Sequence, residues 1–399
     1  VEVLRGPQST LFGKNASAGV ISFTTRAPSF DWTGSVEGTL GNFNAQQLKG
    51  YVSGPISDSV AFSLSAGLNK RDGYAETTDG DDLNNRDRYN LRGQLLWEAT
   101  ENTTFRLIGD YDDSDEDCCY VALVDPAEAG GPFTGDGIDS FAVVAALGGV
   151  INMDPFGYTP ALDFVPNGAL KNSGVSLEVT HDFGWAEFTS ITATRNQESR
   201  FNGDSDFIQL DLLGSNRNDW DIDTFTQEFR LTGSTDRLDW LVGAFYYDED
   251  LEKNSDVLMG ADANEFVDVS SGGLTQVLED GLGIGTFFGE GTGRREFFQQ
   301  ENQSYNLFAQ ADYALTDRLT ATLGIGYVND EKDVVFRGTS DEIYSLLNFE
   351  DPTLASAVGD IIFGATFAAL TMQEPTLANI GALAVNDPTS FAGIQAAAA

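Results

Sequence analysis

The stretch SYNLFAQADYALTDRLTATLGIGY, from Ser304 to Tyr327, alternates apolar and polar residues on both sides of one short turn. Its apolar sets are Tyr305, Leu307, Ala309, Ala311 and Tyr313, then Leu319, Ala321, Leu323, Ile325 and Tyr327. Successive side chains of a β-strand point to opposite faces, so this period of two predicts two antiparallel strands joined at Thr316 to Arg318.

The same period recurs from Trp32 onward, and we count eleven strands in the chain. The charged residues of these strands fall on the face opposite the apolar one; they are Glu37, Lys49, Arg92, Arg106, Asp110, Glu178, Glu228, Arg230 and Asp312. A Lys or Arg that faces lipid costs about 2–4 kcal/mol at the bilayer midplane, so this sorting is expected of strands that meet hydrocarbon. Around Trp240 to Tyr247 both faces are apolar, and this strand is weaker support.

The connections between the strands alternate in length. Short turns such as 101–103 and 183–185 alternate with long acidic segments at 72–87, 112–173, 196–219 and 248–302, apart from a brief first connection. Tilted strands of about 9–11 residues span a bilayer, and aromatic residues gather at the two interfaces. These features predict an all-β fold, a transmembrane antiparallel β-barrel, with a soluble β-sandwich as the alternative.

Composition narrows the function classes. The chain of 399 residues has 62 acidic and 22 basic residues and a net charge of −40, which argues against nucleic acid as a partner. No window approaches about 18 uninterrupted apolar residues, so we expect no transmembrane helix. The nearest candidate, LASAVGDIIFGATFAALT, is interrupted by Asp360.

The opening residues VEVLRGPQSTLFGKNASAGVISFTTRAP, Val1 to Pro28, resemble the end of the plug domain of TonB-dependent outer-membrane receptors. TQEFRLTG (Thr226 to Gly233) and the stretch from Ser304 to Tyr327 resemble barrel strands of that family. The resemblance implies a plug inside a barrel of about 22 strands. We therefore expect residues 1–30 to end the plug, 31–339 to form the first half of the barrel with long extracellular loops, and 340–399 to be an incomplete extracellular loop or tail. An odd number of strands cannot close a barrel, which also indicates part of a larger protein.

The resemblance assigns a plug signature to Arg5, Gly6, Pro7, Gly13 and Gly19. A cation inside a confined, water-filled lumen should seek carboxylates. We therefore hypothesise that Arg5 docks the plug on Glu178 or Glu228, which point inward on our strand assignment. The alternative is that Arg5 is a solvated surface charge.

The function implied by the resemblance is energy-coupled uptake of a scarce nutrient across the outer membrane of a Gram-negative bacterium, with an iron-siderophore complex as the first expectation. The implied partners are a TonB-type energy-coupling protein, through an N-terminal segment absent from this chain, the nutrient ligand, and outer-membrane lipid. A passive porin shares the barrel but has no use for the plug-like opening stretch. A soluble β-sandwich for binding or adhesion is the other alternative, and ligand-binding residues are not assigned.

Other chemistry has little support in the sequence. His181 is the single histidine and ends a strand beside a short turn, so we expect neither an enzyme nor a resident metal or cofactor. The acidic runs DGDDLNNRD (Asp79 to Asp87) and DYDDSDEDCC (Asp110 to Cys119) invite a calcium site, but their spacing fits a hydrated acidic loop better. The adjacent Cys118 and Cys119 are expected to be unpaired thiols. Loop aromatics such as Phe287 and Phe288 could contact ligand or pack the loops.

Overall fold

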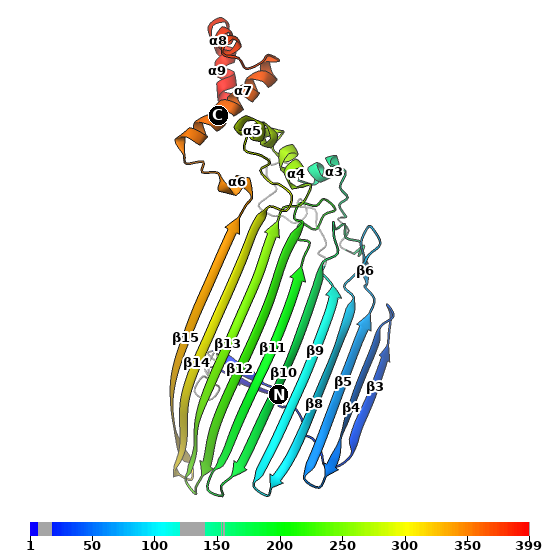
Figure 1. Ribbon diagram of the computed structural model, residues 1–399, viewed down its shortest axis with the longest axis vertical. Helices are drawn as coiled ribbons and strands as arrows, with labels where there is room; N and C mark the ends of the chain where they lie inside the picture. The colour runs from blue at the N-terminus through cyan, green and yellow to red at the C-terminus, as the bar shows by residue number, and fades with distance from the viewer. Residues whose placement is uncertain (7–17, 120–139, 153, 155, 399) are drawn as a thin grey trace.

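The computed structural model describes residues 1–6, 18–119, 140–152, 154 and 156–398. About half of them belong to one antiparallel sheet of eleven strands, in which the strands are paired in chain order (Figure 1). The strands are β3 (Thr33–Leu40), β4 (Gln46–Ser57), β5 (Val60–Arg71), β8 (Arg86–Thr100), β9 (Thr103–Asp117), β10 (Asn167–Asp182), β11 (Glu187–Asn202), β12 (Ser215–Ser234), β13 (Leu238–Leu258), β14 (Gly293–Thr316) and β15 (Leu319–Ser340). The predicted all-β fold and its count of eleven strands are confirmed.

The register shows that the two faces of the sheet differ as predicted. Leu95 lies opposite Leu107 and Leu107 opposite Leu177, whereas Arg106, one residue along, lies opposite Glu178 on the other face. On β14 the exposure is reversed relative to a soluble protein, because Leu307 is 57% exposed while Asn306 is 1% exposed. An apolar face turned outward fits lipid and excludes the soluble β-sandwich, in which that face would pack between two sheets.

Aromatic pairs mark both ends of the outward apolar band. Near the short turns, the rings of Trp97 and Phe105 stack at 5.1 Å between centroids. Toward the long loops, Tyr89 and Tyr111 lie 5.9 Å apart. On β8 the two aromatic pairs are represented by Tyr89 and Trp97, and the stretch from one to the other is nine residues long. This length matches the ~9–11 residues that a tilted strand needs to span a bilayer.

The strands are longer than the bilayer requires, and the predicted length of about 9–11 residues is wrong for most of them. β13 has 21 residues and β14 has 24, and they remain paired out to Leu258 and Gly293. The two longest connections are therefore 118–166 and 259–292 rather than 112–173 and 248–302. Beyond the lipid both faces of a strand meet water, so the alternation of apolar and polar residues stops there. The backbone N–H and C=O groups still form hydrogen bonds with the neighbouring strand, so the pairing continues.

The long connections carry short helices and a small hairpin. They are α3 (Ser140–Ala146), α4 (Ala263–Ser270), α5 (Leu274–Leu282), and the strands β6 (Ala75–Glu76) and β7 (Asp82–Leu83). Val144, Ile208 and Leu210 form a buried cluster there, against which Phe266 of α4 packs. The long connections are thus tied together at one end of the sheet, and the short turns lie at the other (Figure 1).

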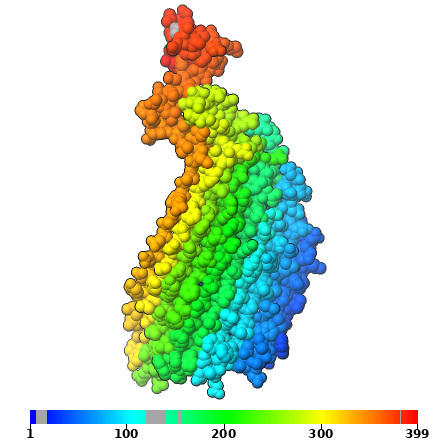
Figure 2. Space-filling model, viewed as in Figure 1, coloured from blue at the N-terminus to red at the C-terminus, as the bar shows by residue number. Residues whose placement is uncertain are grey.

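Residues after β15 form helices that the sequence reading did not predict: α6 (Ile343–Leu346), α7 (Pro352–Thr371), α8 (Leu377–Asn386) and α9 (Pro388–Ala398). They project beyond the long-loop end of the sheet on a narrow neck (Figure 2). α7 is long and apolar enough to cross a membrane by length and composition, contrary to our expectation, because Asp360 alone does not offset its apolar residues. One helix of this kind is weak grounds for a membrane span.

Candidate functional site

The N-terminal residues form a separate two-stranded sheet, β1 (Glu2–Arg5) with β2 (Gly19–Ser22). The N-terminus lies at mid-height of the large sheet in Figure 1. The segment 23–31, which lies between β2 and β3, contacts one face of the sheet through its backbone and through the side chain of Thr25. Arg106 Nη2 donates to the carbonyl of Thr25 at 2.9 Å, and Gln94 Nε2 donates to that of Arg26 at 3.3 Å. We call this segment the linker.

The linker contacts identify the inner face of the sheet. Arg106 and Gln94 share a face and hydrogen-bond to each other, with Arg106 Nη2 2.7 Å from Gln94 Oε1. A third contact lies on β4, where Ser53 Oγ accepts from the backbone N–H of Ser29 at 2.8 Å. The charged face of the strands is thus the face that the N-terminal segment covers, and the apolar face is free to meet lipid.

The predicted signature residues are placed only in part. Arg5 ends β1 opposite Gly19, and Gly6 follows with a φ of +83°. Gly19 has a φ of +152°, and a Cβ there would lie 2.5 Å from the carbonyl oxygen of Leu4, so this close approach requires glycine. Pro7 and Gly13 lie outside the described residues.

The two carboxylates proposed as partners of Arg5 both lie on the inner face. Glu178 is opposite Arg106, and Glu228 forms an ion pair with Arg230 of its own strand. Docking of Arg5 on either carboxylate stays a proposal. The sequence reading missed Arg106 and Gln94 as linker contacts, because alternation places them on the inner face without indicating what covers that face.

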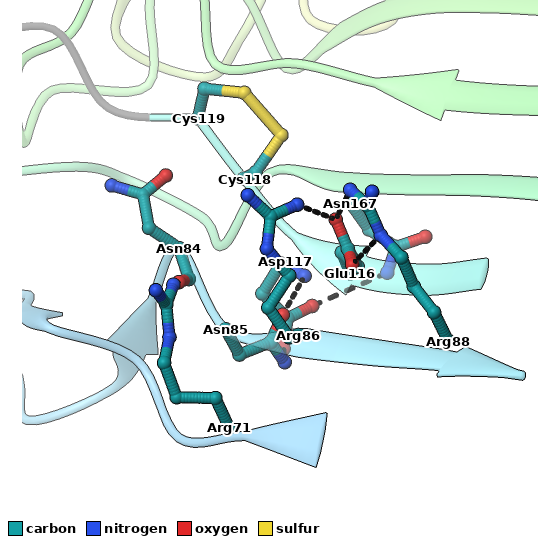
Figure 3. Close-up of a disulfide and its surroundings, with 10 residues drawn as sticks. All are labelled: Arg71, Asn84, Asn85, Arg86, Arg88, Glu116, Asp117, Cys118, Cys119 and Asn167. Carbon is teal, nitrogen blue, oxygen red and sulfur yellow. Dashed lines mark hydrogen bonds and ion pairs between the residues drawn. A yellow bond between two sulfur atoms is a disulfide. The ribbon is translucent and has the colours of Figure 1, made fainter. Parts of the chain in front are cut away.

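The outer ends of β8 and β9 carry a network of charged and amide side chains (Figure 3). Glu116, only 8% exposed, accepts from Arg88 Nε at 2.5 Å and Arg88 Nη2 at 2.7 Å, and from Arg86 Nη1 at 3.2 Å. Burial raises the pKa of Glu116, but the hydrogen bonds and charges of the two arginines outweigh it and hold that pKa below its ordinary value. The next residue, Asp117, accepts from Asn85 Nδ2 at 3.3 Å.

Directly after this network, Cys118 and Cys119 form a disulfide with each other (Figure 3). Our expectation of two unpaired thiols is therefore wrong. The backbone N–H of Cys118 donates to the carbonyl of Pro166 at 2.9 Å, which joins the end of β9 to the start of β10. The disulfide thus lies where the chain leaves the paired strands for the long connection.

Two loop aromatics are structural. Phe287 is 1% exposed, and its backbone N–H donates to Glu279 Oε1 of α5 at 2.6 Å. The rings of Phe287 and Phe288 both contact Tyr344, with centroids 5.9 and 5.3 Å away. Of the two alternatives open for these residues, packing of the loops is the one that the contacts support.

Three carboxylates from two long connections meet in the outer loops. One oxygen each from Asp163, Asp204 and Asp206 lies within 4.8 Å of the others, which is a spacing that could hold a cation. The pKa of Asp163 is raised to about 8, chiefly because the carboxyl is buried and next because it is hydrogen-bonded to Asp204. Burial, with the charge of Asp204, also raises the pKa of Asp206 to about 7. Neither acidic run singled out in the sequence contains these residues, since the cluster forms only when the connections fold together.

At the opposite, short-turn end, His181 behaves as a structural residue. Its Nδ1 lies 2.8 Å from Thr103 Oγ1, and its ring meets Phe183 edge-on at 4.5 Å. This placement agrees with the expected rim position.

Comparison with known proteins finds receptors among the relatives of this chain. No family model matches the chain. The ferrioxamine B receptor of Salmonella typhimurium is 33% identical over 110 residues, which are 27% of this chain and 15% of that protein. The pesticin receptor of Yersinia pestis is 37% identical over 84 residues, 21% of this chain and 12% of that protein.

Solved structures share the fold at low identity. The ferric yersiniabactin uptake receptor of Yersinia pestis has a TM-score of 0.63 at 17% identity, covering 86% of this chain and 45% of that one. The ferripyoverdine receptor of Pseudomonas aeruginosa, solved with ferripyoverdine bound, has a TM-score of 0.57 at 14% identity, covering 85% and 42%. The chain spans less than half the length of either receptor.

The sheet, its outward apolar band and the linker on its inner face define part of an outer-membrane β-barrel. Within that class, the sequence relatives and the shared fold support the resemblance to TonB-dependent outer-membrane receptors that the opening residues carry. The outward apolar band and a relative named as an outer membrane protein, the iron-regulated virulence protein of Vibrio cholerae, both support the outer membrane of a Gram-negative bacterium as its location.

Proposed function

We propose that this chain is part of a receptor for energy-coupled uptake of an iron-siderophore complex. In this proposal residues 1–30 end the plug, 31–339 form the first half of the barrel, and 340–399 belong to an extracellular loop. The observation that carries the proposal is the linker held on the inner face by Arg106 and Gln94. The names of the ferrioxamine B and ferripyoverdine receptors support the cargo.

A passive porin is disfavoured by the same contact. An N-terminal segment anchored across the inner wall obstructs free diffusion, whereas a plug has to be held there until energy displaces it. The proposed partners are therefore a TonB-type energy-coupling protein, a ferric siderophore and outer-membrane lipid. The relatives are receptors, and we assign no catalytic step to the chain.

The test is uptake of radioactive iron by iron-starved cells that carry or lack the gene for the whole receptor. Ferrioxamine B, ferric yersiniabactin and ferripyoverdine would be supplied separately, each with and without a protonophore. Loss of uptake of one complex in the deletion strain, and in the protonophore-treated wild type, is the expected result. Uptake that persists in de-energised cells would point to a passive channel, and unchanged uptake of every complex would overturn the iron-siderophore assignment.

A further inference from the structure

Four residues form one row across the middle of the inner face: Arg92 on β8, Asp110 on β9, Gly174 on β10 and Arg195 on β11. The register pairs Arg92 with Asp110, Asp110 with Gly174, and Gly174 with Arg195. Directly opposed residues of antiparallel strands share a face. Arg92 is two positions from Gln94, which contacts the linker, so the row faces the N-terminal segment.

Glycine at position 174 allows Arg195 to reach across a whole strand. A Cβ at Gly174 would lie 2.9 Å from Arg195 Nη2 and 3.1 Å from its Cζ. Through this opening Arg195 Nη2 donates to both carboxylate oxygens of Asp110, at 2.9 and 2.8 Å. Its Nη1 donates to Asn172 Oδ1 at 2.7 Å. The carboxylate of Asp110 is thereby committed to Arg195.

Arg92, on the other side of Asp110, is left with unused hydrogen-bonding capacity. Its Nε is buried, and no acceptor for it exists among the residues that the structure describes. A cavity of about 220 Å³ opens at this point and is lined by Arg92, Asp110 and Arg195. Two cations and one carboxylate make the cavity net positive, in a chain whose net charge is −40.

A buried donor of a charged group without an acceptor costs free energy, and a guanidinium is best satisfied by a planar pair of anionic oxygens. We propose that this cavity binds an anionic oxygen group such as a carboxylate, with Arg92 as the principal contact. Its depth is that of the bilayer, since Arg92 lies between Tyr89 and Trp97 on β8. The group would enter from the lumen side of the wall.

Two sources could supply the same chemistry. One is a carboxylate of the plug, because the wall two positions away already holds the linker. The other is an ionised group of a solute in the lumen, and only this source rests on the proposed function. The two differ in what Arg92 stabilises, so one substitution with two readouts separates them.

The experiment uses the whole receptor, purified and folded, with Arg92→Gln, and with Lys49→Gln as the matched control. Lys49 is an inner-face cation whose partner is Glu37 at 3.9 Å, away from this row. Citrate serves as the carboxylate probe in titration calorimetry, and hydrogen exchange reports the protection of plug amides. Arg92→Lys, which keeps the charge but not the planar donor pair, serves if Arg92→Gln fails to fold.

A loss of citrate affinity of about tenfold or more in Arg92→Gln, with less than about twofold in Lys49→Gln, would support the site with a solute as its source. Faster exchange of plug amides in Arg92→Gln alone, without citrate binding to either protein, would support the site with a plug carboxylate as its source. If Arg92→Gln changes neither citrate binding nor plug exchange, the inference is overturned. Neither readout requires iron transport, so failure here is distinct from failure of the proposed function.

Discussion

The orientation of the strand faces is open to a direct test with two neighbouring substitutions, Ala309→Arg and Gln310→Arg. Ala309 lies opposite Val242 and Ile325 on the outward face, midway between Tyr305 and Tyr313 of the same strand. It is therefore near the middle of the lipid band. Gln310 is on the inner face.

The expected magnitudes follow from these positions. An arginine at the bilayer midplane costs about 2–4 kcal/mol, and alanine has almost no side chain to lose, so the full cost should be seen at Ala309. That cost is a decrease of about 30-fold to about 900-fold in the ratio of folded to unfolded receptor. Gln310 Nε2 already donates to Asp312 Oδ2 at 3.2 Å, and an arginine there would gain a carboxylate neighbour. Gln310→Arg should therefore change the free energy of unfolding by no more than about 1 kcal/mol, as is found for solvated ion pairs.

The assay is denaturant-induced unfolding of the whole receptor reconstituted in phospholipid vesicles, followed by tryptophan fluorescence. Each substituted receptor is compared with the wild type in vesicles of the same composition. A greater cost at Gln310 would mean that the inner and outer faces have been exchanged, and equal costs would mean that neither face meets lipid. Either result would refute the outer-membrane interpretation.

Three further predictions concern the long-loop end of the molecule. Glu116→Gln should lower the free energy of unfolding by about 1–2 kcal/mol, since Arg88 loses a nearly buried carboxylate; an unchanged melting temperature would contradict this. Gly260→Ala places a methyl group against Asp211 and should speed hydrogen exchange in 259–262, whereas Gly359→Ala, which meets no atom within 4 Å, should not. Because Asp163 keeps its proton when folded, with its pKa raised from 3.8 to about 8, the stability of its loop should fall as pH rises from about 4 to 8; protease cleavage that slows over this range would refute it.

The sequence was sufficient to predict the strands within the membrane, because lipid on one face and water on the other force an alternation that can be read residue by residue. The charges of Arg92, Arg106 and Glu178 were placed on the correct face for this reason. The strand ends were predicted less well. From Asp248 to Asp256 on β13 the residues are polar on both faces except for Leu251, so the alternation that marks a paired strand is lost there.

Features that depend on contacts between distant segments could not be predicted. Asp163 and Asp204 are brought together by two different connections, and neither has a local motif around it. Arg195 reaches Asp110 because Gly174 lies between them in the register. The register between strands cannot be read from the sequence of any single strand. The adjacent cysteines could have been read either way, and the paired form is the one present.

The nature of the linker contacts constrains how a plug could move. Arg106 and Gln94 hold backbone carbonyls, and Ser53 holds a backbone N–H. Arg106 Nη2 also donates to Thr25 Oγ1 at 3.0 Å, so Thr25 is the one linker residue whose side chain takes part in these contacts. At about 0.5–1.5 kcal/mol per hydrogen bond, the three backbone contacts together contribute about 1.5–4.5 kcal/mol. A rearrangement of the N-terminal segment must therefore either overcome that amount or take place before Thr25 while the linker stays in place. The second route leaves the wall and its central row intact, and it keeps the segment attached to the barrel after each movement.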